Sequence, residues 1–217
     1  MCSHVRIGDQ APDFTAETTQ GKIRFHEWIG NNWCVFFSHP KNFTPVCTTE
    51  LGYAAKMKKE FDKRKTKIIA LSIGTVEDHK HWIPDINLSQ NTTVEYPLIG
   101  DKDKKIASLY GMVHPNESET TTVRTVFIID PNKKIRLMIA YPASTGRNFD
   151  ELLRVIDALQ LTDDQKVATP VNWHHGAECI ILPSITDPNE IKELFPQGYR
   201  EVLPYLRYTQ VHEKSLS

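Results

Sequence analysis

Short apolar segments alternate with helix-like segments from residue 6 to residue 161, and this alternation constrains the fold more than any other feature. The clearest strand is Trp33–Ser38, a run of aromatic and β-branched residues that is typical of a buried strand. The same criteria predict strands at 67–73, 96–99, 123–129 and 135–141, and helices at 46–65, 76–86, 104–110 and 149–159. The turn at 130–133 joins the last two strands and predicts a β-hairpin. Strands and helices in this order predict an α/β fold with a central sheet and flanking helices.

The chain changes character after residue 165, where proline becomes frequent and one helix is well signalled. That helix covers 188–195, with Asp187 as its N-cap and Pro188 at its first position. We therefore divide the chain into a main domain, residues 1–165, and a small C-terminal arm, residues 166–217. An arm of this length is too short to form its own core, so its aromatic side chains are expected to pack on the main domain or on a second copy.

Composition and charge exclude several classes of protein. The 217 residues include 26 Lys and Arg and 27 Asp and Glu, and a chain without a basic surplus is not typical of nucleic-acid binding. The longest apolar runs, such as Cys34–Phe37, are far too short to span a membrane. The first residues lack the apolar stretch of a secretory signal, so we expect a cytoplasmic protein. The four cysteines form no CxxC pair and are expected to be free thiols.

Cys47 lies at the start of the predicted helix 46–65, directly after a loop that contains Pro40 and Thr44. Unpaired backbone N–H groups and the helix dipole favour an anion at this position, and the reactive form of a cysteine is the thiolate. The hydroxyl of Thr44, three residues earlier, can donate to a small oxygen ligand. The alternative is that Cys47 is a small buried side chain on the helix face. Its position at the helix start favours the reactive cysteine.

Arg124 is an unusual residue for the interior of an apolar strand. Alternation places it on the same face as Val126 and Ile128, so it points inward if both faces of the sheet are covered. A buried guanidinium requires an anion or several acceptors. Two partners remain open, a carboxylate near the end of the strand and a thiolate.

The spacing PxxxTxxC, formed by Pro40, Thr44 and Cys47, resembles the active-site motif of the peroxiredoxins. His39 and the segments 122–124, 141–149 and 167–173 are similar to the one-cysteine, peroxiredoxin-6-type subfamily, and the similarity covers nearly the whole chain. The resemblance implies a thioredoxin-like fold and an antioxidant peroxidase. It also implies a homodimer, formed through the C-terminal arm or through the edge of the sheet.

The resemblance further implies a role for each residue of the motif. The Cys47 thiolate would attack hydrogen peroxide or an organic hydroperoxide and become a sulfenic acid. Thr44 and the backbone N–H groups of Val46 and Cys47 would hold the peroxide oxygens, and Arg124 would stabilise the developing charge. Pro40 would shield the pocket from water. For His39, a hydrogen bond near the sulfur and a structural role in the loop both stay open.

A sulfenic acid must be reduced by a second thiol. Cys179 is expected to be a buried thiol in an apolar strand rather than a resolving cysteine, and we assign no role to Cys2 or Cys34. The reductant is therefore expected to be external: glutathione, in the family delivered by a glutathione transferase, or glutaredoxin or thioredoxin. No cofactor and no metal are expected, because His79 and His81 are two residues apart on a helix and are predicted to lie on its solvated face.

Some members of this subfamily also hydrolyse phospholipids through a Gly-x-Ser-x-Gly-like segment with a histidine and an aspartate. The corresponding segment here is 30–34, with Asn32 at the serine position. His26 is present, but Asn132 replaces the acidic residue. An amide is not a nucleophile, so we expect no phospholipase activity.

A binding or holdase-type protein, whose Cys47 only senses oxidation, is the alternative from another class. Such a protein would show no turnover with any thiol donor. A dependence of catalysis on Arg124 and Thr44 would distinguish the enzyme from the sensor.

Overall fold

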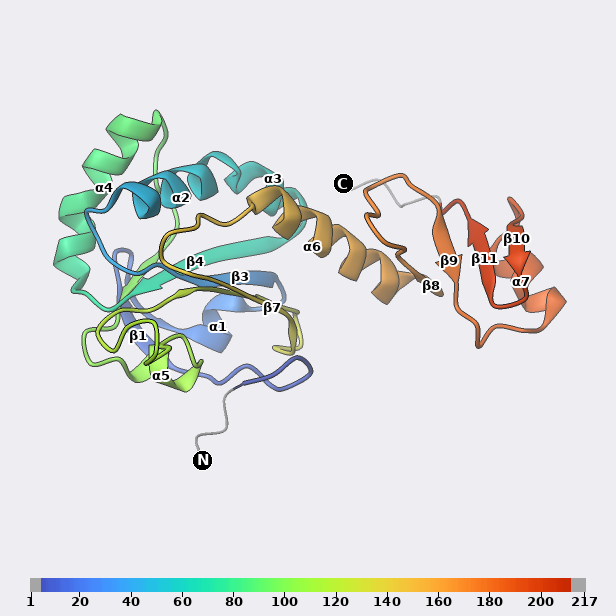
Figure 1. The fold of residues 1–217 in the computed structure, drawn as a ribbon, viewed down its shortest axis with the longest axis horizontal. Coiled ribbons are helices and arrows are strands. Elements are labelled where there is room, and N and C mark those ends of the chain that lie inside the picture. The colour runs from blue at the N-terminus through green and yellow to red at the C-terminus, as the bar shows by residue number, and fades with distance from the viewer. Residues whose placement is uncertain (1–4, 212–217) are drawn as a thin grey trace. The chain divides into compact units, whose positions relative to one another are not determined.

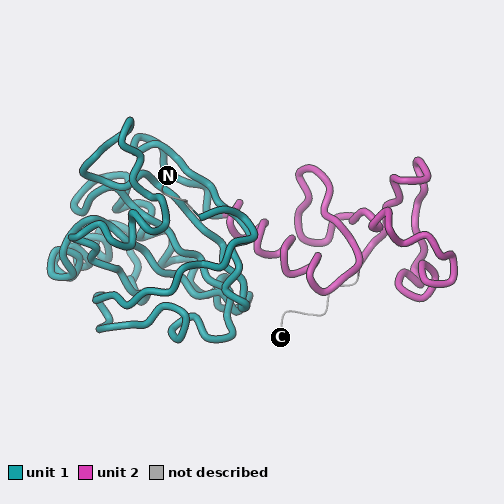
Figure 2. The backbone as a smooth tube through the Cα atoms, turned by 90° about the horizontal axis from the view of Figure 1, so that it is seen from below, with its two compact units in different colours: residues 1–149 teal, residues 150–217 magenta. Residues whose placement is uncertain are grey.

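The computed structural model describes residues 5–211, which divide into two compact units after Phe149 (Figures 1 and 2). Most of helix α6 (Phe149–Asp164) belongs to the second unit. The boundary after residue 165 remains a prediction. Cys2 lies outside the described residues.

The first unit is built on a seven-stranded sheet with the order β2-β1-β5-β4-β3-β6-β7. Its strands are β1 (Thr15–Thr18), β2 (Gly21–Arg24), β3 (Trp33–Ser38), β4 (Thr66–Ser72), β5 (Leu98–Gly100), β6 (Arg124–Ile129) and β7 (Ile135–Tyr141). Strands β3, β4 and β5 run parallel, whereas β6 and β7 form the predicted antiparallel hairpin. Every residue of β3 and β6 is buried, which explains why both read as continuous apolar runs. The predicted α/β class with a central sheet is confirmed.

Helices cover both faces of this sheet, with α2 and α4 on one side and α1 and α5 on the other (Figure 1). Their bounds are α1 (Phe25–Ile29), α2 (Pro45–Lys56), α3 (Lys58–Lys63), α4 (Val76–Gln90) and α5 (Lys105–Leu109). The single helix predicted at 46–65 is wrong, because the backbone at Met57 (φ −85°, ψ 0°) leaves the helical region and separates α2 from α3. Within residues 5–211, no helix combines the length and apolar character needed to cross a membrane.

The second unit has a small core that the arm shares with α6, so the arm packs on a helix of the main domain as we had bounded it, which agrees with the expectation. Strands β8 (Val167–Ala168), β9 (Cys179–Ile181), β10 (Arg200–Leu203) and β11 (Leu206–Thr209) form a four-stranded sheet beside α7 (Pro188–Leu194). Trp173, Ile181 and Phe195 are buried together with Ala158 and Leu161 of α6. The helix supplies the apolar surface that the arm lacks by itself. As predicted, Asp187 caps α7, accepting a hydrogen bond from the N–H of Asn189 at 2.9 Å.

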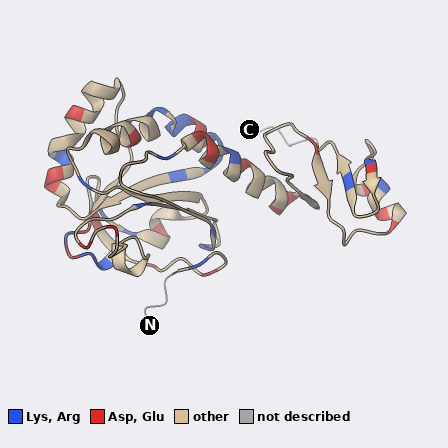
Figure 3. Cartoon of the chain, in the orientation of Figure 1, with Lys and Arg blue, Asp and Glu red and all other residues tan. Residues whose placement is uncertain are grey.

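Basic and acidic residues are interspersed along α3 and α4 (Figure 3). Lys63 pairs with Glu60 at 2.6 Å, and Lys80 pairs with Glu77 at 2.8 Å, each three residues apart on its helix. Exposed pairs of this kind contribute little to stability, because water and salt screen them. The charges with structural consequences are therefore the buried ones.

Candidate active site

Cys47 is buried in the first turn of α2, at the third helical position. Thr44 is the N-cap residue, and its hydroxyl donates to the carbonyl of Lys41 at 2.8 Å. Pro45 follows at the first helical position with φ suited to a helix and without an N–H group. The N–H groups of the first turn have no acceptor within the helix, so an anionic sulfur or a bound oxygen is favoured there.

Arg124, the first residue of β6, contacts both of the partners that the sequence left open. Its Nη1 atom donates to the Cys47 sulfur at 3.3 Å and to Oε2 of Glu50 at 2.7 Å. Nε and Nη2 donate to the carbonyl oxygen of Ala143 at 3.0 Å and 2.6 Å. The guanidinium is 2% exposed, so these hydrogen bonds compensate its removal from water.

Glu50 is a buried carboxylate that the sequence analysis did not include in the site. It follows Cys47 by three residues, so both side chains lie on one side of α2. Besides Arg124, it contacts Arg147, whose backbone N–H donates to Oε1 at 2.8 Å. The spacing of three residues between Cys47 and Glu50 was the sequence signal that could have placed Glu50 beside the cysteine. Helical periodicity alone does not identify it, because a glutamate is normally expected on the solvent-exposed face of a helix.

Arg147 is the second residue that the sequence analysis missed. Its side chain is buried, with Nε 3.5 Å from Oε1 of Glu50 and the guanidinium 4.9 Å from the ring centre of Phe37. Nη2 donates to the carbonyl of Ser38. Burial lowers the pKa of Arg147 to about 10, and Glu50 opposes this shift, so the group stays charged at neutral pH.

We call Glu50, Arg124 and Arg147 the charge cluster. Two guanidinium groups and one carboxylate leave a net charge of about one positive unit beside the sulfur. An anionic sulfur would neutralise it. The cluster therefore favours the thiolate and any negative charge that develops next to it.

The other predicted residues lie around the same loop. Pro40 is buried directly after β3, and Thr44 and Val46 are half-buried. His39 is fully buried, with Nε2 3.1 Å from Oδ1 of Asn42 and its ring beside those of His79 and Trp82. Burial lowers the pKa of His39 well below its ordinary value, so this imidazole is neutral.

His79 is buried rather than solvated, and the prediction for it is wrong, whereas His81 is exposed. The ring of His79 lies on the inner face of α4, where Nε2 is 3.0 Å from the hydroxyl of Ser72. A polar partner allows a histidine to occupy an apolar face. Over the described range 5–211, no group of three or more His, Cys, Asp or Glu side chains is arranged to hold a metal ion.

A buried cysteine at a helix start, in contact with an arginine, is the site of a thiol-dependent enzyme. Residues 7–138 match the AhpC/TSA family, and residues 158–196 match the C-terminal domain of 1-Cys peroxiredoxin. The chain therefore belongs to the AhpC/TSA family of peroxiredoxins and, within it, to the 1-Cys peroxiredoxins. It is a thiol-dependent peroxidase.

Curated relatives and solved structures are similar to this protein over most of its chain. The 1-Cys peroxiredoxin of Dictyostelium discoideum is 51% identical, over 94% of this chain and 85% of that protein. Peroxiredoxin-6 of Gallus gallus is 52% identical, over 94% and 96%. A crystal structure of a cysteine-to-serine variant of the peroxiredoxin 6 of Arenicola marina matches with a TM-score of 0.91 and 46% identity, covering 97% of this chain and 100% of that chain. A yeast mitochondrial 1-Cys peroxiredoxin, described as resolved via glutathione/thioredoxin systems, matches with a TM-score of 0.90 and 49% identity, covering 95% and 100%.

Proposed function

We propose that Cys47 is the nucleophile that reduces hydrogen peroxide and organic hydroperoxides. The observation that carries this proposal is the 3.3 Å contact between Nη1 of Arg124 and the Cys47 sulfur, inside the charge cluster. The thiolate attacks one peroxide oxygen, so that an S–O bond forms while the O–O bond breaks. The electron pair leaves on the other oxygen, which takes up a proton and departs as water or an alcohol. The products are a sulfenic acid at Cys47 and the reduced peroxide.

The surrounding groups act on the peroxide oxygens. The N–H groups of Val46 and Cys47 point from the helix start and stabilise charge on the leaving oxygen, and the Thr44 hydroxyl adds one further polar group. Arg124 is held by Ala143 and Glu50, so it needs no rearrangement when charge develops. Pro40 covers the site against water.

The test is peroxide consumption at neutral pH with excess dithiothreitol. Cys47→Ser should abolish turnover, while a variant with Cys2, Cys34 and Cys179 all replaced by serine should remain active. Cys34 is a suitable internal comparison, because burial in β3 raises the pKa of its thiol far above the ordinary value and keeps it protonated. A triple variant that reacts once and then stops would identify a resolving cysteine and contradict the one-cysteine mechanism.

The reductant is an external thiol, for which glutathione is our first choice. The yeast relative resolved via glutathione/thioredoxin systems supports both glutathione and thioredoxin. Glutathione transferase and glutaredoxin are further candidates as partners. The oxidised protein should be incubated with glutathione, with and without each protein partner, and with a thioredoxin system. Return of the free Cys47 thiol identifies the donor, and failure of all of them would contradict external reduction.

We propose that this chain has no phospholipase activity. The amide of Asn32 donates to the carbonyl of Ile29 at 3.0 Å, and Nε2 of His26 lies 2.8 Å from the carbonyl of Ala11, so both side chains have structural partners. Asn132 cannot supply the negative charge that a catalytic histidine needs. An assay of fatty-acid release from phosphatidylcholine vesicles should show no activity. Release that disappears in His26→Ala would refute this.

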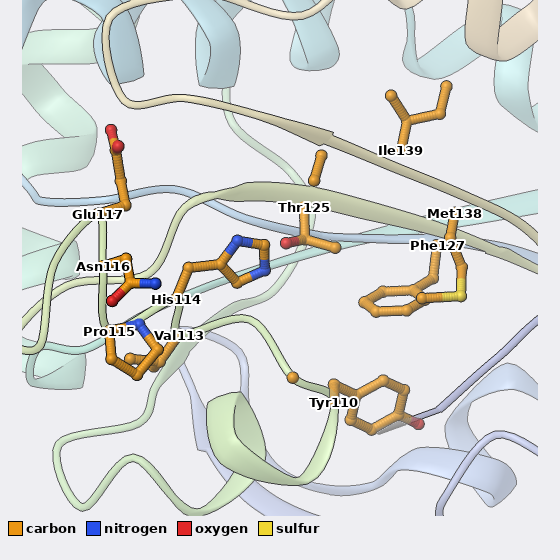
Figure 4. Close-up of a pocket in the computed structure, with 12 residues that line it drawn as sticks. Tyr110, Val113, His114, Pro115, Asn116, Glu117, Thr125, Phe127, Met138 and Ile139 are labelled. Carbon is orange, nitrogen blue, oxygen red and sulfur yellow. The ribbon is translucent and has the colours of Figure 1, made fainter. Parts of the chain in front are cut away.

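A homodimer formed through the edge strand β7 is the assembly that we propose, in the cytoplasm. Residues 8–11 cover the start of this edge, where the N–H of Ile135 donates to Asp9 at 3.0 Å, but the strand continues beyond them. Beside it lies an open cavity of about 630 Å³, lined by apolar side chains such as Phe127 and Met138 and by polar ones such as His114 and Glu117 (Figure 4). An unpaired strand edge beside an open hollow is suited to a second copy.

Sedimentation of two variants would distinguish the sheet edge from the arm. Ala140 is exposed on β7, and Tyr205 is 66% exposed in the arm, so arginine at either position is compatible with a folded monomer. Ala140→Arg should convert the dimer to a monomer, whereas Tyr205→Arg should not. The reverse result would assign the interface to the arm.

A further inference from the structure

Four polar side chains form a buried cluster that includes two residues of the loop before Cys47. We call it the Asn42 cluster; its members are His39, Asn42, Ser72 and His79, each at most 9% exposed. Oδ1 of Asn42 accepts hydrogen bonds from the Ser72 hydroxyl at 2.9 Å and from Nε2 of His39 at 3.1 Å. The Ser72 oxygen lies 3.0 Å from Nε2 of His79. The cluster thus joins strand β4 and helix α4 to the loop.

The hydrogen bonds of the Asn42 cluster have a single direction. The one hydroxyl proton of Ser72 goes to Asn42, so the Ser72 oxygen must accept the Nε2 proton of His79. Burial lowers the pKa of His79 to about 4, so the ring is neutral and carries this single proton at neutral pH. His79 therefore donates to Ser72, and Ser72 donates to Asn42. The ring therefore acts in this network through Nε2, the atom that contacts the Ser72 oxygen.

The loop that receives these hydrogen bonds is strained. Asn42 is its buried anchor, while Lys41 and Phe43 on either side are exposed. The backbone of Phe43 has φ +56°, a conformation that costs free energy for a bulky L-residue and persists when its surroundings hold it. Thr44 follows directly and is the N-cap of α2, which carries Cys47. A shift at Asn42 would therefore move the groups that face the peroxide.

Helix α4 holds two consecutive residues of this loop. His79 reaches Asn42 through Ser72, and Trp82, three residues further along α4, places its ring 5.9 Å from that of Phe43. The helix is itself fixed at its start, where Thr75 and Asp78 form a capping box. A helix that is capped at its start therefore supports the strained part of the loop.

We propose that Ser72 and His79 are positioning residues for the peroxidase reaction, acting through Asn42 on the loop that carries Thr44. This inference rests on the proposed role of Cys47. Both residues lie outside the PxxxTxxC motif and act through Asn42 rather than on the substrate.

Three variants test this network against a matched control. His79→Phe keeps the ring size but removes the donor, His79→Gln keeps a donor, and Ser72→Ala removes the connecting hydroxyl. His81→Phe makes the first change two residues away, on the exposed side of α4. The rate constant for oxidation of Cys47 by hydrogen peroxide should fall about 10- to 100-fold in His79→Phe and Ser72→Ala, because small misplacements of reacting groups have effects of this size. His79→Gln should recover most of the rate, and His81→Phe should match the wild type.

Alkylation of Cys47 by iodoacetamide distinguishes positioning from general damage to the site. This reagent needs a reactive thiolate but no oriented peroxide, so its rate should change less than about 3-fold in the same variants. A merely structural defect would change both rates together. Urea unfolding of each variant establishes that it is folded under the assay conditions.

Each outcome has a defined meaning. If a folded His79→Phe or Ser72→Ala protein reacts with peroxide as fast as the wild type, or if His79→Gln is as slow as His79→Phe, the positioning role is refuted. Parallel loss of both rates refutes it as well. If His79→Phe does not fold, Ser72→Ala, which removes one hydroxyl, decides the question. Full peroxide activity in Cys47→Ser would instead refute the proposed function itself.

Discussion

Glu50 offers the sharpest test of the charge cluster, because replacing one carboxylate oxygen by an amide nitrogen removes the negative charge of this side chain. Glu50→Gln preserves the shape of the side chain but leaves Arg124 and Arg147 buried without their carboxylate partner. Breaking a buried ion pair costs about 3–5 kcal/mol. We expect the lower end, about 3 kcal/mol, because the carbonyls of Ala143 and Ser38 still accept hydrogen bonds from the two guanidinium groups. With an m-value of about 2 kcal/mol/M, the urea midpoint should fall by about 1.5 M.

Glu60→Gln is the matched control for this measurement. Glu60 also contacts two basic side chains, Lys63 at 2.6 Å and Arg64 at 3.1 Å, but its side chain is 42% exposed. Exposed pairs are screened, so its urea midpoint should remain close to that of the wild type. Both variants should be unfolded in parallel with reduced protein and followed by tryptophan fluorescence. Equal midpoints for the two variants would refute the reasoning that burial makes the Glu50 pairs essential.

Three further predictions concern the active site, the Asn42 cluster and the second unit. Arg124→Lys should slow the peroxide reaction about 100-fold in stopped-flow measurements, because an ammonium group cannot contact the Cys47 sulfur and Ala143 with the geometry of a guanidinium; a rate near that of the wild type would contradict this. The folded state holds the pKa of His79 at about 4, below its ordinary 6.5, so it binds fewer protons than the unfolded state and loses about 3 kcal/mol of stability as the pH falls from 6.5 to 4. Urea midpoints measured across this range should show less of this loss in His79→Gln, and equal losses would exclude His79 as its source. Asp187→Ala should cost the second unit about 1 kcal/mol through loss of the α7 cap, visible as a lower thermal midpoint, and an unchanged midpoint would show that the cap is dispensable.

The sequence predicted the sheet, and it singled out Cys47, for physical reasons. Strands β3 and β6 are apolar on both faces, which makes them recognisable without knowledge of their neighbours. Cys47 was recognisable because its chemistry depends on a local feature, the start of a helix, which Pro45 and the preceding loop signal. Arg124 stood out because a cation in an apolar strand requires a partner, although the sequence could not decide which one.

The missed residues are those whose burial depends on partners far along the chain. Glu50 is buried because it accepts a hydrogen bond from Arg147, which lies 97 residues later in the chain. The periodicity of apolar residues in a helix cannot predict such a long-range contact. His79 is buried beside the hydroxyl of Ser72 on the preceding strand, and that hydroxyl is paired in turn with Asn42, which lies in another loop. The core of the second unit combines the arm with α6, which we had assigned to the main domain, so the arm packs on that helix as expected.

The two clusters around the active-site loop contain opposite kinds of group, since one holds paired charges and the other holds neutral imidazoles. The charge cluster keeps its guanidinium groups ionised by pairing them, whereas the Asn42 cluster keeps its imidazoles neutral by burial. The positive charges of Arg147 and Arg124 add to the lowering of the His39 pKa, so the field that favours an anionic sulfur also disfavours a second cation in the loop.

Formation of a sulfenic acid removes the anion and leaves the charge cluster with its positive excess. A sulfinate is again an anion and restores neutrality, so the electrostatics of this site do not protect Cys47 from further oxidation. Protection must come instead from rapid access of an external thiol, and the loop held by the Asn42 cluster lies directly before the cysteine that this thiol must reach.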